Sequence, residues 1–144
     1  MKNTSYAHKT VLITGASSGI GEAFGHLLAQ ERANLILTAR PEAKLQQLAK
    51  KLRQAHSIQV HVFPADLSQI EAPQQLIQQI QSAGLSVDLL INNAGFGKWT
   101  YFDQLPLSVF QEMVSLNIQG LMALSYLCHA CHNCLPKKRA GLSM

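Results

Sequence analysis

The sequence predicts an α/β fold in which helices cover both faces of a parallel β-sheet. Short β-branched and aliphatic segments alternate with longer segments of helical periodicity, and this alternation is typical of strand–helix–strand units. The short segments carry so few polar residues that we expect both of their faces to be buried. With 144 residues, 47% of them hydrophobic and 14% charged, the chain has the size and composition of one packed domain.

Each expected element follows from this pattern. The four strands are expected at Thr10–Thr14, Asn34–Ala39, Ile58–Phe63 and Val87–Asn92. The first helix is expected over Gly19–Glu31, with an inward stripe of Ile20, Ala23, Phe24, Leu27 and Leu28. Pro41 suits the first turn of a second helix, whose inward positions are Leu45, Leu48, Ala49 and Leu52.

The last two helices are expected after the third and fourth strands. Ser68 and Glu71 have the spacing of a capping box for a helix that bears Leu76, Ile77 and Ile80. A longer helix is expected from about Leu107 to beyond Leu127, with Phe110, Val114, Leu121 and Leu124 among its apolar positions.

Composition argues against several classes of protein. No stretch approaches the ~18 apolar residues of a membrane span, so we expect no membrane segment and a cytoplasmic location. There cysteines stay reduced, and a disulfide framework is not expected. Three of the twelve Lys and Arg residues are Lys137, Lys138 and Arg139, and the other nine nearly balance the eight Asp and Glu. The body of the chain is therefore near neutral, and nucleic acid is not expected as a partner.

The most informative motif lies where the first strand meets the first helix, in Thr14–Gly21 (TGASSGIG). Its three glycines have the spacing G-x-x-x-G-x-G. A strand that turns directly into a helix exposes the first N–H groups and the positive dipole end of that helix, and glycines let a phosphate approach the backbone. The turn predicts a diphosphate site; the alternative is a tight turn whose glycines only pack the helix.

Further motifs follow the later strands. Asp66 and Leu67 come after the third strand, NNAG (Asn92–Gly95) ends the fourth, and Asn117 lies in the long last helix. Together with TGASSGIG they resemble the short-chain dehydrogenase/reductase family over about Lys9–Leu127. The resemblance implies a Rossmann-like doubly wound sheet, here incomplete with about four strands and four helices. It implies an NADP-binding domain over residues 1–127, followed by an atypical tail, 128–144, that is not an independent domain.

The resemblance also implies the residues that bind the cofactor. Its phosphates would contact Gly15, Ser17, Ser18, Gly19, Ile20 and Gly21. Asp66 would bind the adenine amino group with Leu67 beside the ring, while Asn93, Ala94 and Gly95 would line the adenosine ribose. Taken alone, Asp66 is explained as a polar residue just before a helix, and NNAG is explained as a turn.

The choice of cofactor depends on the end of the second strand, where an acidic residue would bind the ribose 2′-OH. The sequence there has Ala39 and then Arg40. A guanidinium pairs well with a phosphate, so NADP(H) is favoured over NAD(H), with Lys44 as a second cation. The alternative is that Arg40 is a solvated loop residue.

The resemblance implies the family's activity, which is hydride transfer between a nicotinamide cofactor and an alcohol or carbonyl substrate. For this the family uses a serine, a Y-x-x-x-K pair and an asparagine. Only the asparagine, Asn117, is matched here. The residues four positions after the three tyrosines are Thr10, Leu105 and Ala130, so no Y-x-x-x-K occurs. We therefore expect the chain to be inactive alone. Its substrate, a small carbonyl or alcohol by family, is not specified; Phe96, Trp99, Tyr101 and Phe102 are either pocket walls or loop packing.

The expected end of the sheet carries a liability. If the strand order is 3-2-1-4, Val87–Asn92 forms an edge with unpaired backbone groups and uncovered apolar side chains. Self-association or aggregation through this strand is therefore expected.

The last residues, CHACHNCLPKKRAGLSM, hold all three cysteines. Cys128, Cys131 and His132 match C-x-x-C-H, a haem attachment motif. Alternatively, Cys128, Cys131 and Cys134, with His129 or His132 as the fourth ligand, could hold zinc or an iron–sulfur cluster. The segment could also continue the helix with its cysteines inward. We favour a truncated or frame-shifted coding sequence, because composition changes abruptly after Leu127, and we expect no metal. Two other functions stay open: a non-catalytic dinucleotide- or partner-binding module, and a small metal or haem redox protein.

Overall fold

The computed structural model describes residues 5–130. Within this range four parallel strands form one sheet in the order β3-β2-β1-β4. The strands are β1 (Thr10–Thr14), β2 (Asn34–Thr38), β3 (Val60–Val62) and β4 (Leu89–Ile91). The α/β class and the predicted strand order are confirmed. The two outer strands, β3 and β4, are shorter than expected, and each pairs with one neighbour only.

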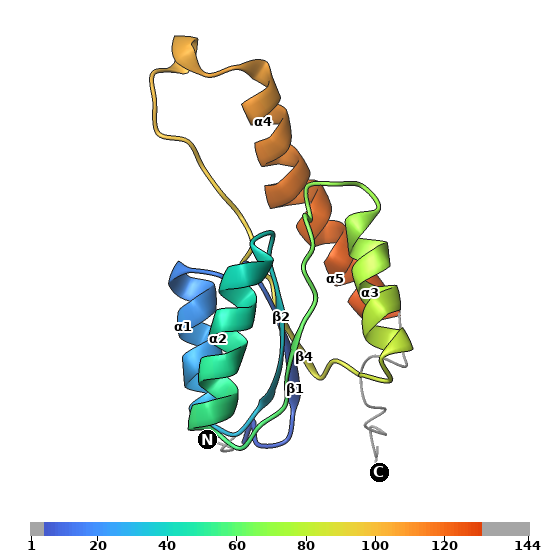
Figure 1. Cartoon of the computed structure of the whole chain (residues 1–144). Coiled ribbons are helices and arrows are strands. Elements are labelled where there is room, and N and C mark those ends of the chain that lie inside the picture. Colours follow the sequence, from blue (N-terminus) through green and yellow to red (C-terminus); the bar gives the residue numbers. More distant parts are fainter. Residues whose placement is uncertain (1–4, 131–144) are drawn as a thin grey trace, which may run out of the picture.

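Alternate residues of the central strands face opposite layers of helices (Figure 1). Val11 and Ile13 of β1 pack on the side of α1 (Gly19–Gln30) and α2 (Glu42–Ala55). Leu12 packs on the other side, with α3 (Ala72–Ser82) and α5 (Leu121–Ala130). Both faces of the sheet are thus buried, as the apolar strands predicted. The expected inward positions of α2 and α3 are also buried: Leu45, Leu48, Ala49, Leu52, Leu76, Ile77 and Ile80.

The predicted inward stripe of α1 is largely wrong. Ile20 and Leu27 are 69% and 58% exposed, whereas the buried positions are Gly21, Gly25, Leu28 and Ala29. Small residues decide the orientation, because they bring the helix backbone close to its neighbours. At Gly25 the helix backbone faces α2, and a Cβ placed there would be in van der Waals contact with the Leu52 side chain, at 3.7 Å. The glycine face therefore packs inward, and the larger apolar residues beside it stay in solvent.

Two predicted helix starts are also corrected. Glu71 is the N-cap of α3 and makes no side-chain cap, and the Ser68 hydroxyl donates to the Asp66 carboxylate instead, 2.7 Å away. The capping box is therefore absent, because Ser68 lies before the helix and its hydroxyl is used by the preceding aspartate. Pro41 is the N-cap of α2 rather than a first-turn residue.

The long last helix is present but not uniform. It runs as α4 (Leu107–Val114), a π-helical segment (Ser115–Gly120) and α5. Leu124 is fully buried, but Val114 is 48% exposed, because α4 projects beyond the sheet (Figure 1). No helix within residues 5–130 has the length and hydropathy to cross a bilayer.

Candidate functional site

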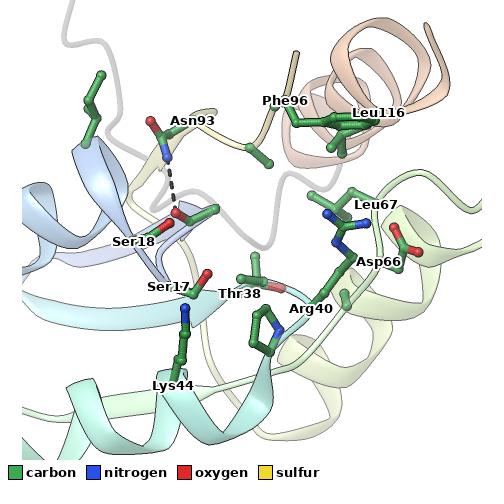
Figure 2. Close-up of a pocket in the computed structure, with 17 residues that line it drawn as sticks. Ser17, Ser18, Thr38, Arg40, Lys44, Asp66, Leu67, Asn93, Phe96 and Leu116 are labelled. Atoms are coloured by element: carbon green, nitrogen blue, oxygen red, sulfur yellow. Dashed lines mark hydrogen bonds between the residues drawn. The ribbon is translucent and has the colours of Figure 1, made fainter. Parts of the chain in front are cut away.

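A cavity of about 570 Å³ lies at the carboxyl ends of the strands (Figure 2). Open parallel sheets bind ligands at this edge. The predicted residues that line it are Gly15, Ser17, Ser18, Ile20, Arg40, Asp66, Leu67, Asn93, Ala94 and Gly95. Lys44 and Phe96 line it too, together with five residues that were not predicted as site residues: Thr38, Ala39, Pro41, Ala65 and Leu116. Gly19, Gly21 and Asn117 do not line it.

The turn between β1 and α1 depends on its glycines. Gly15 has φ +63°, and a Cβ there would lie 2.9 Å from the Ala94 Cα. A Cβ on Gly21 would lie 2.3 Å from the Gly15 carbonyl oxygen, so Gly21 packs the helix against its own turn. Nothing lies within 4 Å of a Cβ placed on Gly19, and the Ser18 side chain makes no cap. The start of α1 is consequently open to an anion.

Thr14 and Asn93 tie this turn to the NNAG segment. The Thr14 hydroxyl accepts hydrogen bonds from the backbone N–H groups of Asn93 and Ala94, both at 2.9 Å. The Asn93 amide donates to the Thr14 carbonyl at 3.1 Å and to the Gly15 carbonyl at 3.3 Å. Asn93 therefore lines the cavity and also orients the glycine turn. Thr14 was not a predicted site residue, although its position at the end of a buried strand was a usable signal.

Asp66 is held as a carboxylate. Its partial burial opposes ionisation, but hydrogen bonds from Ser68 and Gln69 and the charge of Arg40 outweigh burial and hold its pKa below the ordinary value. The Ser68 N–H and hydroxyl both donate to Oδ1, at 3.1 and 2.7 Å. The cavity therefore has one fixed acceptor group at the side of β3.

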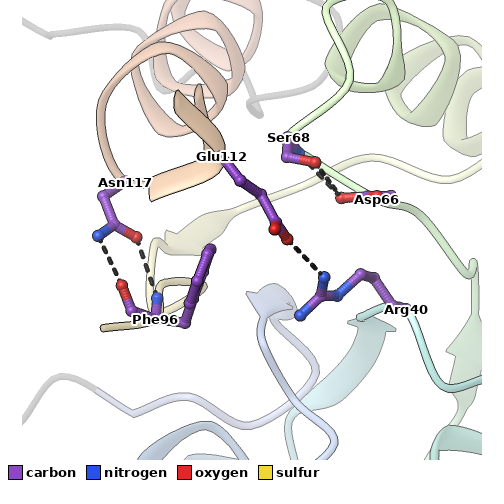
Figure 3. A network of polar contacts seen from close by, with 6 residues as sticks. All are labelled: Arg40, Asp66, Ser68, Phe96, Glu112 and Asn117. Carbon is purple, nitrogen blue, oxygen red and sulfur yellow. Dashed lines mark hydrogen bonds and ion pairs between the residues drawn. The ribbon is translucent and has the colours of Figure 1, made fainter. Parts of the chain in front are cut away.

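Two cations, Arg40 after β2 and Lys44 in the first turn of α2, line the cavity. Lys44 points toward Ser17 in Figure 2. Arg40 donates from Nη1 to Glu112 Oε1 at 3.0 Å, and its guanidinium carbon lies 6.0 Å from the centre of the Phe96 ring (Figure 3). Sequence reasoning missed Glu112, since it lies 72 residues from Arg40 on a separate element.

Asn117 holds the chain that leaves the NNAG segment. Its Nδ2 donates to the Phe96 carbonyl at 2.9 Å, and its Oδ1 accepts the Phe96 N–H at 3.0 Å. Asn117 lies in the π-helical segment, and such segments occur often at functional sites. The Asn117 side chain does not line the cavity; it positions the loop that runs beside the cavity.

The remaining candidates give no site in the described range. Trp99, Tyr101 and Phe102 are exposed by 104%, 77% and 85% and do not line the cavity, so of the four aromatic residues only Phe96 is a wall. Cys128 is buried in the core beside α3, as the helical interpretation of the tail expected. Within residues 5–130 no three His, Cys, Asp or Glu side chains gather as metal ligands. Cys131, His132 and Cys134 lie outside the described residues.

The family model for short chain dehydrogenase matches residues 9–142. The chain belongs to the short-chain dehydrogenase/reductase family. The match continues past Leu127 through most of the tail. Among curated sequences, an 11-beta-hydroxysteroid dehydrogenase of Pinus massoniana is 38% identical over 78% of this chain and 32% of its own length. An uncharacterised oxidoreductase of Staphylococcus aureus is 34% identical over 83% of this chain and 50% of its own. The chain thus spans half or less of these relatives.

Solved structures of this short-chain dehydrogenase/reductase family superpose on the described fold. An alcohol dehydrogenase of Thermococcus sibiricus, complexed with 5-hydroxy-NADP, has a TM-score of 0.80 at 30% identity and covers 85% of this chain and 52% of its own. A short-chain dehydrogenase of Sphingobium yanoikuyae, in complex with NADPH, has a TM-score of 0.76 at 32% identity. The match covers 83% of this chain and 47% of that dehydrogenase. The resemblance to this family, inferred from four short motifs, is confirmed.

Proposed function

We propose that this chain is the NADP(H)-binding part of a short-chain dehydrogenase/reductase that interconverts small alcohols and carbonyls. One observation carries the proposal: Arg40 and Lys44 line the same cavity as the glycine turn and the NNAG segment. A dinucleotide presents a diphosphate and, in NADP(H), a 2′-phosphate, and these anions match a glycine-rich helix start and a guanidinium. The relatives in complex with NADPH and 5-hydroxy-NADP are consistent with this pairing.

Each group of residues has a proposed task. The turn formed by Gly15, Ser17 and Ser18 would hold the diphosphate against the start of α1. Asp66 would accept the adenine amino group, Asn93 would face the adenosine ribose, and Arg40 would bind the 2′-phosphate. The nicotinamide, when bound, supplies or accepts the hydride. Asn117 would contribute indirectly, by fixing the loop at Phe96.

Catalysis by these 144 residues alone is not part of the proposal. The proton that accompanies hydride transfer needs a group with a tuned pKa. The chain contains no Y-x-x-x-K pair. We therefore propose cofactor binding without turnover, and oxidation of NADPH with a panel of carbonyl compounds would overturn that part.

Equilibrium binding tests the cofactor directly. Titration with NADPH and NADH should give the lower dissociation constant for NADPH, and Arg40→Gln should remove most of the difference. Lys50→Gln, an exposed change on α2 outside the cavity, is the matched control and should leave both constants unchanged. Equal binding of NADPH and NADH by the wild-type chain would contradict the preference for NADP(H).

A second candidate function is a module that completes its sheet with another chain. β4 ends the described sheet, and Leu89 on it is 37% exposed. An edge with an uncovered apolar side chain favours strand addition. Light scattering should show self-association that Leu89→Lys weakens; a monomer at all protein concentrations would contradict this candidate.

A further inference from the structure

The contact between Arg40 and Glu112 crosses the rim of the cavity. Arg40 follows β2 and lines the cavity, whereas Glu112 lies on α4, which projects past the sheet (Figures 1 and 3). Their side chains are 54% and 40% exposed, so the ion pair is solvated rather than part of the core. Pairs of this kind contribute little to stability. The pair can therefore open when a ligand competes for one partner.

Glu112 changes the charge that a ligand meets. Of the charged side chains that line the cavity, Arg40 and Lys44 are positive and Asp66 is negative. The Glu112 carboxylate lies 3.0 Å from Arg40 Nη1 and cancels the remaining positive charge. A phosphate that approaches Arg40 has two routes. It can displace the Glu112 carboxylate from Arg40 Nη1, or it can bind the other N–H groups of the guanidinium while the Glu112 carboxylate stays beside it. Either route weakens phosphate binding, because like charges are brought together.

A 2′-hydroxyl does not meet this opposition. It carries no charge, and its binding does not require Arg40 to leave Glu112. Phosphate monoesters carry about −1.5 to −2 charges near pH 7, so the carboxylate acts almost entirely on the phosphorylated ligand. The structure therefore provides a group that acts on the choice between the two ligands and not on adenosine binding in general.

We propose that Glu112 is a specificity-determining residue that weakens binding of a 2′-phosphorylated adenosine by competing with the phosphate for Arg40. This inference rests on the proposed dinucleotide site. It adds that the preference for the 2′-phosphate is set by the balance between Arg40 and Glu112. The presence of Arg40 by itself does not set it.

Two small probes isolate the 2′-phosphate: adenosine 2′,5′-bisphosphate and adenosine 5′-monophosphate. Their dissociation constants are measured by calorimetry on the full chain for wild type, Glu112→Gln, Arg40→Gln and the double variant. We expect Glu112→Gln to tighten bisphosphate binding about three- to tenfold at low salt and to leave monophosphate binding within about twofold. Glu31→Gln, at the exposed C-cap of α1, is the charge-matched control and should change neither constant.

The double variant separates competition from general repulsion. If Glu112 acts through Arg40, the gain from Glu112→Gln should shrink in the Arg40→Gln background. An undiminished gain there, or weaker bisphosphate binding by Glu112→Gln, overturns the inference.

The four proteins also separate this inference from the proposed function. If Arg40→Gln weakens bisphosphate binding and Glu112→Gln has no effect, only the role of Glu112 is overturned. If Arg40→Gln has no effect on either probe, or neither probe binds, the proposed site and this inference are both overturned.

Discussion

The Thr14 hydroxyl accepts the backbone N–H groups of both Asn93 and Ala94 at 2.9 Å. This one side chain, fully buried at the end of β1, fixes the NNAG segment beside the glycine turn. The Thr14 hydroxyl therefore couples the two halves of the candidate site, beside the hydrogen bonds from the Asn93 amide to the Thr14 and Gly15 carbonyls, and its share of that coupling is testable.

Thr14→Val should lower the free energy of unfolding by about 1–3 kcal/mol, because it leaves two N–H groups of the NNAG segment without their acceptor. Urea denaturation measures the change. Thr38→Val is the matched control: Thr38 is equally buried, but its hydroxyl has no hydrogen-bond partner within the described range. We expect the control to be neutral or slightly stabilising. Equal losses from both variants would contradict the role of Thr14.

Gly21→Ala should disrupt the turn and abolish dinucleotide binding, since its Cβ would lie 2.3 Å from the Gly15 carbonyl oxygen. Circular dichroism melting and NADPH titration measure the two effects. Gly84→Ala provides a control, because Gly84 has φ +71° with nothing within 4 Å of a Cβ. Its backbone strain should cost about 1–2 kcal/mol without any change in NADPH affinity. Normal NADPH binding by a folded Gly21→Ala variant would contradict the packing described here.

Asp66→Asn should reveal a stability term that depends on pH. Burial opposes ionisation of Asp66, but the hydrogen bonds from Ser68 and Gln69 and the charge of Arg40 prevail and keep its pKa below the ordinary value. The stabilisation is therefore fully present above the unfolded pKa of about 3.9 and is lost as the pH falls through the folded pKa.

Urea denaturation at several pH values measures this term. The stability difference between wild type and Asp66→Asn should be constant above about pH 5 and shrink below about pH 4. Asp103→Asn, at an exposed position of the short 3-10 helix Phe102–Gln104, controls for the loss of one negative charge. A difference that grows as the pH falls would reverse the sign and contradict the assignment.

Asn117→Asp should loosen the loop at Phe96. The aspartate retains an acceptor for the Phe96 N–H but places a second oxygen against the Phe96 carbonyl, where Nδ2 now donates at 2.9 Å. We expect faster hydrogen exchange at the Phe96 amide and a loss of about 1 kcal/mol in the free energy of unfolding. Gln119→Glu, an exposed neighbour in the same π-helical segment, should leave that exchange rate unchanged.

Much of the site was predictable because its residues lie at fixed positions along their own segments. Gly15 directly follows the first buried strand and begins a turn, and Asp66 follows the third strand. Local pattern therefore placed both residues at the carboxyl edge of a parallel sheet. Arg40 was placed in the same way. The spacing of these residues along the chain carried enough information, since parallel strands bring equivalent ends together.

Other features were not predictable from local pattern. The helical stripe of α1 pointed to Ile20 and Leu27 as inward residues, but Gly21 and Gly25 face the core. Hydrophobicity ranks side chains by their gain on burial, whereas close approach of two backbones is decided by the smallest residues present.

By itself, the sequence determined the order of strands and helices, the glycine turn and the polar residues that follow each strand. Only the tertiary structure decided that Asn117 holds Phe96, that Thr14 joins Asn93, and that Arg40 is paired with Glu112. The physical reason is the separation of the interacting residues along the chain. Turn geometry and strand ends follow from neighbouring residues, whereas each of these contacts joins segments that meet only after the helices pack on the sheet.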